Sequence, residues 1–189
     1  MPEKSPHNRS SIAALLTDMV ASKGAELYGG EAVTQEQHGL QAAFLAESDG
    51  QPAPVIVAAL LHDVGHLFEP EFQRAMELDK DGRHEDIGHA FLKRWFGPEV
   101  TEPVRLHVAA KRYLCATRSG YLEALSPASV HSLALQGGPM SPEEVAAFER
   151  QPHHAAAVQV RIYDDLAKDV DMKTPLLEHF MRYVEAVAA

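Results

Sequence analysis

Several features are scarce in this sequence of 189 residues. Cys115 is its single cysteine, which excludes an intramolecular disulfide and a zinc site built from several cysteines. Basic residues number 17 against 27 acidic ones, so the formal net charge of −10 argues against nucleic acid or an anionic membrane as the main partner. The longest apolar run, residues 53–61, is far shorter than the about 20 residues that span a bilayer, and no signal-peptide pattern opens the chain. We therefore expect a soluble, cytoplasmic protein.

What remains is typical of a folded protein, with one exception. Hydrophobic residues make up 46% of the chain and charged residues 23%, close to the average of globular proteins. The length suits one compact domain, so we expect residues 1–189 to form a single unit. The exception is histidine, with 11 residues beside only 17 Lys and Arg. A metal site in this chain has to use imidazole and carboxylate groups, although composition alone does not make the histidines ligands.

Strand-like alternation is hard to find, whereas apolar residues recur at helical spacing along most of the chain. Thr34 followed by Gln37 predicts a capping box at the start of the second helix. Glycine and proline pairs separate the periodic segments. The pattern predicts an all-α bundle of about seven helices, at residues 11–22, 34–48, 54–67, 84–96, 101–117, 142–168 with a break near Pro152, and 175–188.

The densest chemical signal is the run from His62 and Asp63 to His66 at the end of an apolar helix. A helix that is apolar on all sides is buried, so this His-Asp pair has to find polar or metallic partners. On a continuous helix His66 lies one turn after His62, on the same face. A carboxylate such as Asp63 can also bridge two metal ions, which an imidazole cannot.

Further candidate ligands fall on other predicted helices. Imidazole and carboxylate groups suit iron, manganese or zinc, and these residue types alone do not select among the three metals. A lone histidine is more often a surface or hydrogen-bonded core residue, so the argument rests on the set. In chain order, the set is His38, His62-Asp63, His84, His107 and Asp164.

This order resembles the HD-domain superfamily, in which a His, a His-Asp pair and a distal Asp recur, with extra histidines where two metals are bound. The resemblance covers most of the chain. It implies an all-helical HD domain with two iron ions. One iron would be held by His38, His62 and Asp164 and the other by His84 and His107, with Asp63 bridging them.

Two stretches are similar to a narrower family: Tyr28-Gly29-Gly30-Glu31, and His107 to Lys111 together with Gln136-Gly137-Gly138. They resemble the mixed-valent diiron oxygenases of the PhnZ and TmpB type, which cleave 1-hydroxyalkylphosphonates. The resemblance implies that Tyr28 ligates one iron until substrate arrives, and that Glu31 holds the amine end of the substrate. Gly29 and Gly30 would let Tyr28 move. The alternative is an ordinary turn beside a tyrosine that only packs.

The same family resemblance gives roles to further residues. His66 would stay uncoordinated and form a hydrogen bond to substrate or oxygen. Lys111 follows His107 by one helical turn and Arg161 precedes Asp164 by three residues, so both are expected to bring positive charge to a dianionic phosphonate. Residues matching family positions that contact the phosphonate oxygens are Ser129, Ser132 and Gln136. Histidines without a match, and so without an assigned role, are His7, His89, His131, His153, His154 and His179.

The resemblance implies an oxidoreductase that uses O2 and an Fe(II)/Fe(III) pair to cleave a carbon-phosphorus bond. Its substrate would be (R)-1-hydroxy-2-(trimethylammonio)ethylphosphonate or the primary-amine analogue, giving phosphate with glycine betaine or glycine. A 2-oxoglutarate-dependent hydroxylase would make this substrate. Glu31 can compensate either ammonium, and Tyr28 and Tyr163 are candidate aromatic faces for a quaternary one. Tyr163 stands where family members often carry Trp. Overall resemblance favours the trimethylated compound.

Two other function classes fit the same motif. A hydrolytic HD phosphohydrolase would act on a nucleotide or phosphomonoester through metal-bound hydroxide, and would need neither oxygen nor Tyr28. A signalling or binding domain on a degenerate HD scaffold would need no complete ligand set, so the full set found here disfavours it.

Overall fold

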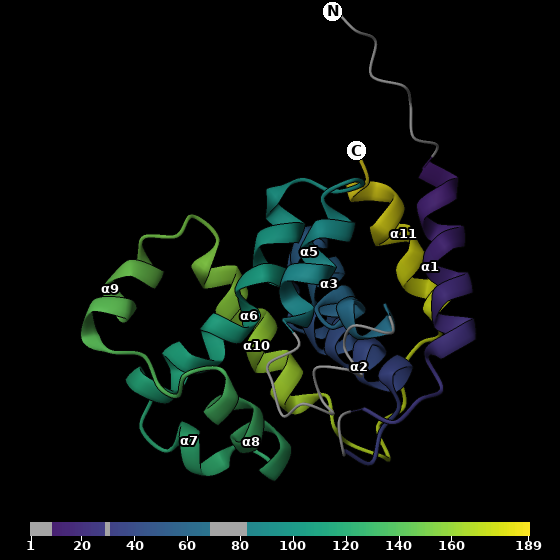
Figure 1. Ribbon diagram of the computed structural model, residues 1–189. Helices are drawn as coiled ribbons and strands as arrows, with labels where there is room; N and C mark the ends of the chain where they lie inside the picture. Colours follow the sequence, from purple (N-terminus) through teal and green to yellow (C-terminus); the bar gives the residue numbers. More distant parts are fainter. Residues whose placement is uncertain (1–8, 29–30, 69–82) are drawn as a thin grey trace, which may run out of the picture.

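The computed structural model describes residues 9–28, 31–68 and 83–189, with side chains from Ile12 onward (Figure 1). Every element named in these ranges is helical, and their extended pairings are two isolated β-bridges, Leu27 with Thr34 and Phe96 with Ala188. The predicted all-α class is therefore confirmed. The elements are α1 (Arg9–Lys23), α2 (Gln35–Ser48), α3 (Ala53–Leu61), the 3-10 helix η1 (Val64–Leu67), α5 (His84–Leu92), α6 (Pro98–Thr117), α7 (Tyr121–Ala124), α8 (Pro127–Leu135), α9 (Pro142–Glu149), α10 (His154–Leu166) and α11 (Leu177–Val187).

The capping box at α2 forms as predicted. The Thr34 side chain accepts a hydrogen bond from the backbone N–H of Gln37 at 3.1 Å, and the Gln37 side chain accepts from the backbone N–H of Thr34 at 2.9 Å. These two bonds satisfy N–H groups that an uncapped helix leaves open. They fix the start of α2, so that His38 lies in its first turns.

The helix predicted at 54–67 differs from the structure, because α3 ends at Leu61 and a separate 3-10 turn follows at η1. The reason is a close tertiary contact at Gly65. A Cβ atom on Gly65 would lie 2.0 Å from the backbone oxygen of His84, where α5 begins. His62 and Asp63 therefore lie between two helical segments, and the expectation of one continuous helix through His66 is wrong.

The expected number of about seven helices is also exceeded in the described residues. The segment 142–168 divides into α9 and α10 around Pro152, as the proline suggested. Two helices, α7 and α8, were not predicted. Helix α7 has four residues, too few to show an apolar period, whereas α8 has nine and was missed despite its start signal at Ser126-Pro127. The left-handed backbone of Gly120 precedes α7, and the Ser126 side chain caps α8.

The main core is built around α3, where seven residues from Val55 to Leu61 are buried. Helices α1, α2, α5, α6, α10 and α11 surround it, and α7, α8 and α9 form a group at the other end of α6 and α10 (Figure 1). A second small core made by Leu106, Ala110, Phe148 and Ala157 attaches α9 to those two long helices. The buried end of α3 is thus held at the centre of the bundle, where the His-Asp pair begins. None of the described helices is long and apolar enough to cross a membrane.

Candidate metal centre

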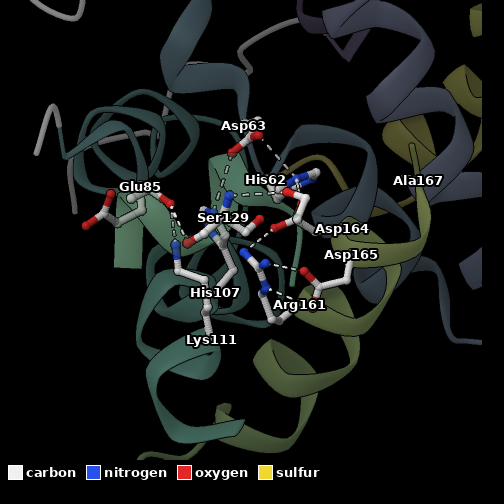
Figure 2. A network of polar contacts seen from close by, with 12 residues as sticks. His62, Asp63, Glu85, His107, Lys111, Ser129, Arg161, Asp164, Asp165 and Ala167 are labelled. Atoms are coloured by element: carbon white, nitrogen blue, oxygen red, sulfur yellow. Dashed lines mark hydrogen bonds and ion pairs between the residues drawn. The ribbon is translucent and has the colours of Figure 1, made fainter. Parts of the chain in front are cut away.

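Four imidazoles and one carboxylate converge beside the end of α3 (Figure 2). They come from four places in the chain: His38 from α2, His62 and Asp63 from the end of α3, His84 from the start of α5 and His107 from α6. All five side chains are buried. The structure therefore brings together residues that the sequence separates by up to 69 positions, from His38 to His107.

Hydrogen bonds to the backbone fix the tautomer of three of these imidazoles. The Nδ1 atom of His38 lies 2.8 Å from the carbonyl oxygen of Ala167. His62 and His107 each direct Nδ1 at the carbonyl oxygen three residues earlier, at 2.8 Å and 2.7 Å. A carbonyl oxygen only accepts hydrogen bonds, so each Nδ1 carries the proton. Each Nε2 consequently presents a lone pair to the centre of the cluster, as a metal-binding histidine does.

The Nε2 atoms face each other in two pairs. His38 and His62 have their Nε2 atoms 3.0 Å apart, and His84 and His107 have theirs 3.1 Å apart. Two lone pairs at this distance repel unless a cation lies between them. Metal–nitrogen bonds of about 2.1 Å at right angles place the two nitrogens about 3 Å apart. Each pair therefore fits one metal ion.

Asp63 lies between the two pairs. Its Oδ2 atom is 3.6 Å from Nε2 of His38 and 3.4 Å from that of His62. Its Oδ1 atom is 3.1 Å from Nε2 of His84 and 3.5 Å from that of His107. Both oxygens are buried, and neither accepts a hydrogen bond from the described residues. A buried, ionised carboxylate without hydrogen bonds destabilises the fold unless a cation compensates its charge. Since one oxygen faces each histidine pair, Asp63 is suited to bridge two metal ions.

The electrostatics of the cluster favour added positive charge. Burial acts to lower the pKa of His62, but Asp63 and Asp164 outweigh burial and raise this pKa to about 9. A proton can therefore take the place of a metal cation between Nε2 of His62 and Nε2 of His38. Burial acts to raise the pKa of Asp63, yet His62, His66 and His84 hold it well below its ordinary value. The carboxylates thus remain ionised, as metal ligands must.

Asp164 of α10 joins the first histidine pair. Its Oδ1 atom lies 3.4 Å from Nε2 of His38, while its Oδ2 atom accepts a hydrogen bond from Nη1 of Arg161 at 2.7 Å. Arg161 is itself buried and also contacts Asp165 and the hydroxyl of Tyr121. Two carboxylates therefore compensate the guanidinium that the resemblance assigned to the phosphonate. In this structure Arg161 positions Asp164.

Tyr28 lies against the same pair. Its ring stacks on the His38 ring with centroids 3.8 Å apart, and its hydroxyl is 3.4 Å from Oδ1 of Asp164. Burial and the charges of Asp164 and Asp63 raise the pKa of this phenol well above its ordinary value. The tyrosine thus lies beside the place where His38, His62 and Asp164 could hold a metal ion, which we call the first metal position. Gly29 and Gly30, the proposed pivot of Tyr28, lie outside the described residues.

His66 lies beside the cluster on η1. Its ring stacks on the His84 ring with centroids 4.1 Å apart, and its Nε2 atom is 3.7 Å from Oδ1 of Asp63. The Tyr28 ring meets it edge-on with centroids 6.4 Å apart. Burial and the neighbouring His84 lower its pKa to about 3, so this imidazole is neutral. His66 therefore lies beside the cluster, and its hydrogen bond to substrate or oxygen stays a prediction. Its position on the far side of a helix break was not expected.

The residues expected to contact a phosphonate gather between α6 and α8. Lys111 donates a hydrogen bond to the Ser132 hydroxyl at 2.7 Å, and Ser132 donates to the backbone oxygen of Ser129 at 3.1 Å. The Oε1 atom of Gln136 is buried and accepts no hydrogen bond from the described residues. Burial and Arg161 lower the pKa of Lys111 to about 8. The group therefore combines a cation with hydroxyl and amide groups, which suits an oxyanion.

Glu31 lies across from this group. Its Oε1 atom accepts a hydrogen bond from the hydroxyl of Ser126 at 2.6 Å and lies 3.4 Å from Nζ of Lys168. Neither Ser126 nor Lys168 was predicted as a site residue, since each is distant in sequence from Glu31. Glu85 was also missed. Its Oε2 atom lies 3.6 Å from Nδ1 of His84, and an acidic residue directly after a candidate ligand was the available signal.

An all-helical fold with two His pairs, a shared aspartate and a distal aspartate defines an HD-type metal-binding protein. The HD domain model matches residues 36–149, and this chain belongs to the HD domain family. It is 46% identical over 184 residues, 97% of this chain and 94% of the relative, to the [1-hydroxy-2-(trimethylamino)ethyl]phosphonate dioxygenase (glycine-betaine-forming) of Leisingera caerulea. It is 43% identical over 172 residues, 90% of this chain and 85% of the relative, to the hydroxymethylphosphonate dioxygenase of Gimesia maris. The family resemblance read from the sequence is thereby confirmed.

Proposed function

We propose that this protein is a diiron oxygenase that uses O2 to cleave the carbon-phosphorus bond of a 1-hydroxyalkylphosphonate. The observation that carries the dinuclear site is the pair of Nε2 separations, 3.0 Å and 3.1 Å, on either side of Asp63. The reaction class rests on the two relatives, both named as dioxygenases of hydroxyphosphonates. The preferred substrate is (R)-1-hydroxy-2-(trimethylammonio)ethylphosphonate, with its primary-amine analogue as the second candidate; the products are phosphate with glycine betaine or glycine.

In this proposal the ligands divide between two iron ions according to the distances among their donor atoms. One iron would be held by His38, His62 and Asp164, the other by His84 and His107, and Asp63 would contribute to both. The donors also suit manganese and zinc. The chemistry of O2 needs a redox-active metal, which excludes zinc, and iron is proposed over manganese because the family resemblance implies it. Bound iron supplies the electrons for oxygen and, as a Lewis acid, lowers the pKa of the substrate hydroxyl.

The protein side chains bind and orient the substrate. Lys111, Ser129, Ser132 and Gln136 take the phosphonate oxygens; Lys111 comes from α6, Ser129 and Ser132 from α8, and Gln136 directly follows α8. The contact of Arg161 with Asp164 keeps that carboxylate ionised and aimed at the first metal position. Tyr28 covers the same position and has to move for oxygen to enter.

Glu31 and His66 act on other parts of the substrate. The carboxylate of Glu31 faces the ammonium group. Neutral His66 lies beside both histidine pairs, so it can form a hydrogen bond to the substrate hydroxyl or to oxygen. Since the substrate already carries a hydroxyl on the carbon next to phosphorus, a hydroxylation has to precede this reaction. We assign that step to a 2-oxoglutarate-dependent hydroxylase.

The test combines metal analysis with turnover. Protein loaded anaerobically with Fe(II) should hold about two irons per chain. After one-electron oxidation to the Fe(II)/Fe(III) state, addition of either aminoalkyl substrate should change its EPR spectrum. With O2, phosphate and glycine betaine or glycine should form in equal amounts with the oxygen consumed. Phosphate release at the same rate under strict anoxia would instead identify the metal-dependent phosphohydrolase.

A further inference from the structure

The ammonium group of Lys168 lies among three groups of the proposed site, two of which, Glu31 and Ser129, the proposed function gives to the substrate. Its Nζ atom is 3.4 Å from Oε1 of Glu31 and donates a hydrogen bond to the Ser129 hydroxyl at 3.1 Å. It also lies 5.8 Å from the centre of the Tyr28 ring, within the range of a cation–π contact. The Lys168 and Glu31 side chains are only 14% and 18% exposed, so solvent screens this ion pair weakly.

The backbone of Lys168 is fixed by the metal centre. The preceding residue, Ala167, is buried, and its carbonyl oxygen lies 2.8 Å from Nδ1 of His38. The side chain leaves this anchored point on a flexible four-carbon stem. The ammonium group can therefore exchange partners among nearby acceptors while the backbone stays in place.

The carboxylate of Glu31 is also held, but by a neutral group. Ser126 donates to its Oε1 atom at 2.6 Å, and the same serine caps α8 through the backbone N–H of Ser129. Glu31 is thus tied to the helix that carries Ser129 and Ser132. A substrate ammonium that reaches Glu31 meets the like charge of Lys168 at the same carboxylate, and two cations there repel each other.

We propose that Lys168 is a specificity-determining residue, an internal cation that competes with the ammonium group of the substrate for Glu31. This inference rests on the proposed function. When a hydroxyphosphonate carries a cationic group, Lys168 yields Glu31 and keeps Ser129, where its charge faces the phosphonate. When the substrate has no cationic group, Lys168 stays on Glu31 and neutralises a carboxylate that would otherwise be left beside the phosphonate dianion.

The test compares two substrates, the trimethylammonio compound and hydroxymethylphosphonate, which has no cationic group. The variant is Lys168→Met, which keeps a long, unbranched side chain without charge. We expect the ratio of kcat/KM for the trimethylammonio substrate to that for hydroxymethylphosphonate to rise roughly fivefold, as expected for one partly screened ion pair. A lost phosphonate contact lowers both values and cancels in the ratio. Lys168→Arg should keep the wild-type ratio, and Lys173→Met at an exposed site is the matched control.

A double variant adds a second measurement. Glu31→Gln should lower the ratio. Adding Lys168→Met should leave the ratio at the value of the Glu31→Gln single variant, because the carboxylate that accepts both Lys168 and the substrate ammonium has been removed. Anaerobic calorimetry gives the Kd of each substrate, and the ratio of the two affinities should change in the same direction as the ratio of kcat/KM. The affinities therefore provide the test if one compound is bound but not turned over. Thermal melting verifies that each variant is folded.

Different results contradict the role of Lys168 and the proposed function. An unchanged or lower ratio in folded Lys168→Met, with wild-type protein turning over its substrate, overturns the role of Lys168 and leaves the oxygenase intact. Wild-type protein that binds these substrates but consumes no O2 with any of them overturns the proposed function, while the calorimetric ratio still tests the competition for Glu31.

Discussion

At the scale of single residues, Asp63 is the most constrained group in the molecule. It lies in a buried cluster with four imidazoles, and its two oxygens each face a different pair of Nε2 atoms. The sequence identified all of these ligand candidates, because a His-Asp pair with further histidines on other helices is a specific pattern. It did not reveal the tautomers, since these depend on carbonyl groups such as that of Ala167, 129 residues from His38.

Replacing Asp63 by Asn should separate its bridging role from its shape. The amide is nearly isosteric but neutral, so we expect iron content to fall from about two to about one per chain and turnover to fall at least about 100-fold. Metal analysis and the rate of phosphate release measure the two effects. Asp171→Asn at an exposed position is the control and should match the wild type. Full iron content in Asp63→Asn would exclude the bridge.

Lys111 should set the alkaline limit of substrate capture. Burial and Arg161 lower its pKa to about 8, so its ammonium form predominates below pH 8 and is lost as the pH rises through that value. We expect kcat/KM for a hydroxyphosphonate to decline above pH 8, since this constant reports ionisations of the free enzyme. Lys111→Met should lower kcat/KM and remove the decline, whereas exposed Lys93→Met should retain it. An alkaline limb that survives in Lys111→Met would assign it to another group.

At the scale of the helices, local signals predicted what local interactions determine. The capping box at Thr34 indicates where α2 begins, and the expected start at residue 54 lies one residue from that of α3. The helix expected from residue 101 begins earlier, because Pro98, read as a breaker, occupies the first position of α6. The break after Leu61 was missed because it depends on the contact of Gly65 with the backbone of His84, which no local pattern contains. Helix α8 was missed as well, although Ser126-Pro127 is a helix-start signal, and with it the element that presents Ser129 to Lys168 was missed.

The contact at Gly65 makes a prediction about how α5 is placed. Ala at this position would bring its Cβ within 2.0 Å of the His84 oxygen, so η1 and α5 must separate. We expect Gly65→Ala to lower the free energy of unfolding by about 2–4 kcal/mol, in the range of overpacked core sites, and to weaken iron binding through His84. Urea unfolding and metal titration measure both effects.

Gly88→Ala is the matched control for this interface. A Cβ on Gly88 would meet side-chain atoms of Val64 and Val104 at 3.3 Å and 3.6 Å, which can adjust, and alanine favours the helix by about 1 kcal/mol. Its loss of stability should therefore be clearly smaller than that of Gly65→Ala. Equal losses in the two variants would mean that the close approach at Gly65 does not govern the position of α5.

At the scale of the whole molecule, the acidic composition and the chemistry of the site are complementary. The chain carries a net charge of −10, yet Lys111, Lys168 and the metal positions gather on one side of α6 and α10. The sequence predicted Lys111 from its distance to His107. Lys168 has no such signal, because its partners are brought to it by two distant parts of the fold: Tyr28 and Glu31 by the connection between α1 and α2, and Ser129 by α8.

The metal centre should also stabilise the whole bundle, because its ligands come from α2, α3, α5, α6 and α10. A ligand present at about 100 times its Kd stabilises the native state by about 2.7 kcal/mol. For a chain of this size that is a rise in Tm of roughly 5–10 °C.

Anaerobic calorimetric scans before and after Fe(II) addition should show this rise, and a chelator should reverse it. The scan of His62→Ala should barely respond, while that of His154→Ala, a half-buried histidine outside the cluster, should respond like the wild type. An equal Tm with and without Fe(II) in the wild type would mean that iron is not bound by the folded bundle, and the dinuclear site would have to be abandoned.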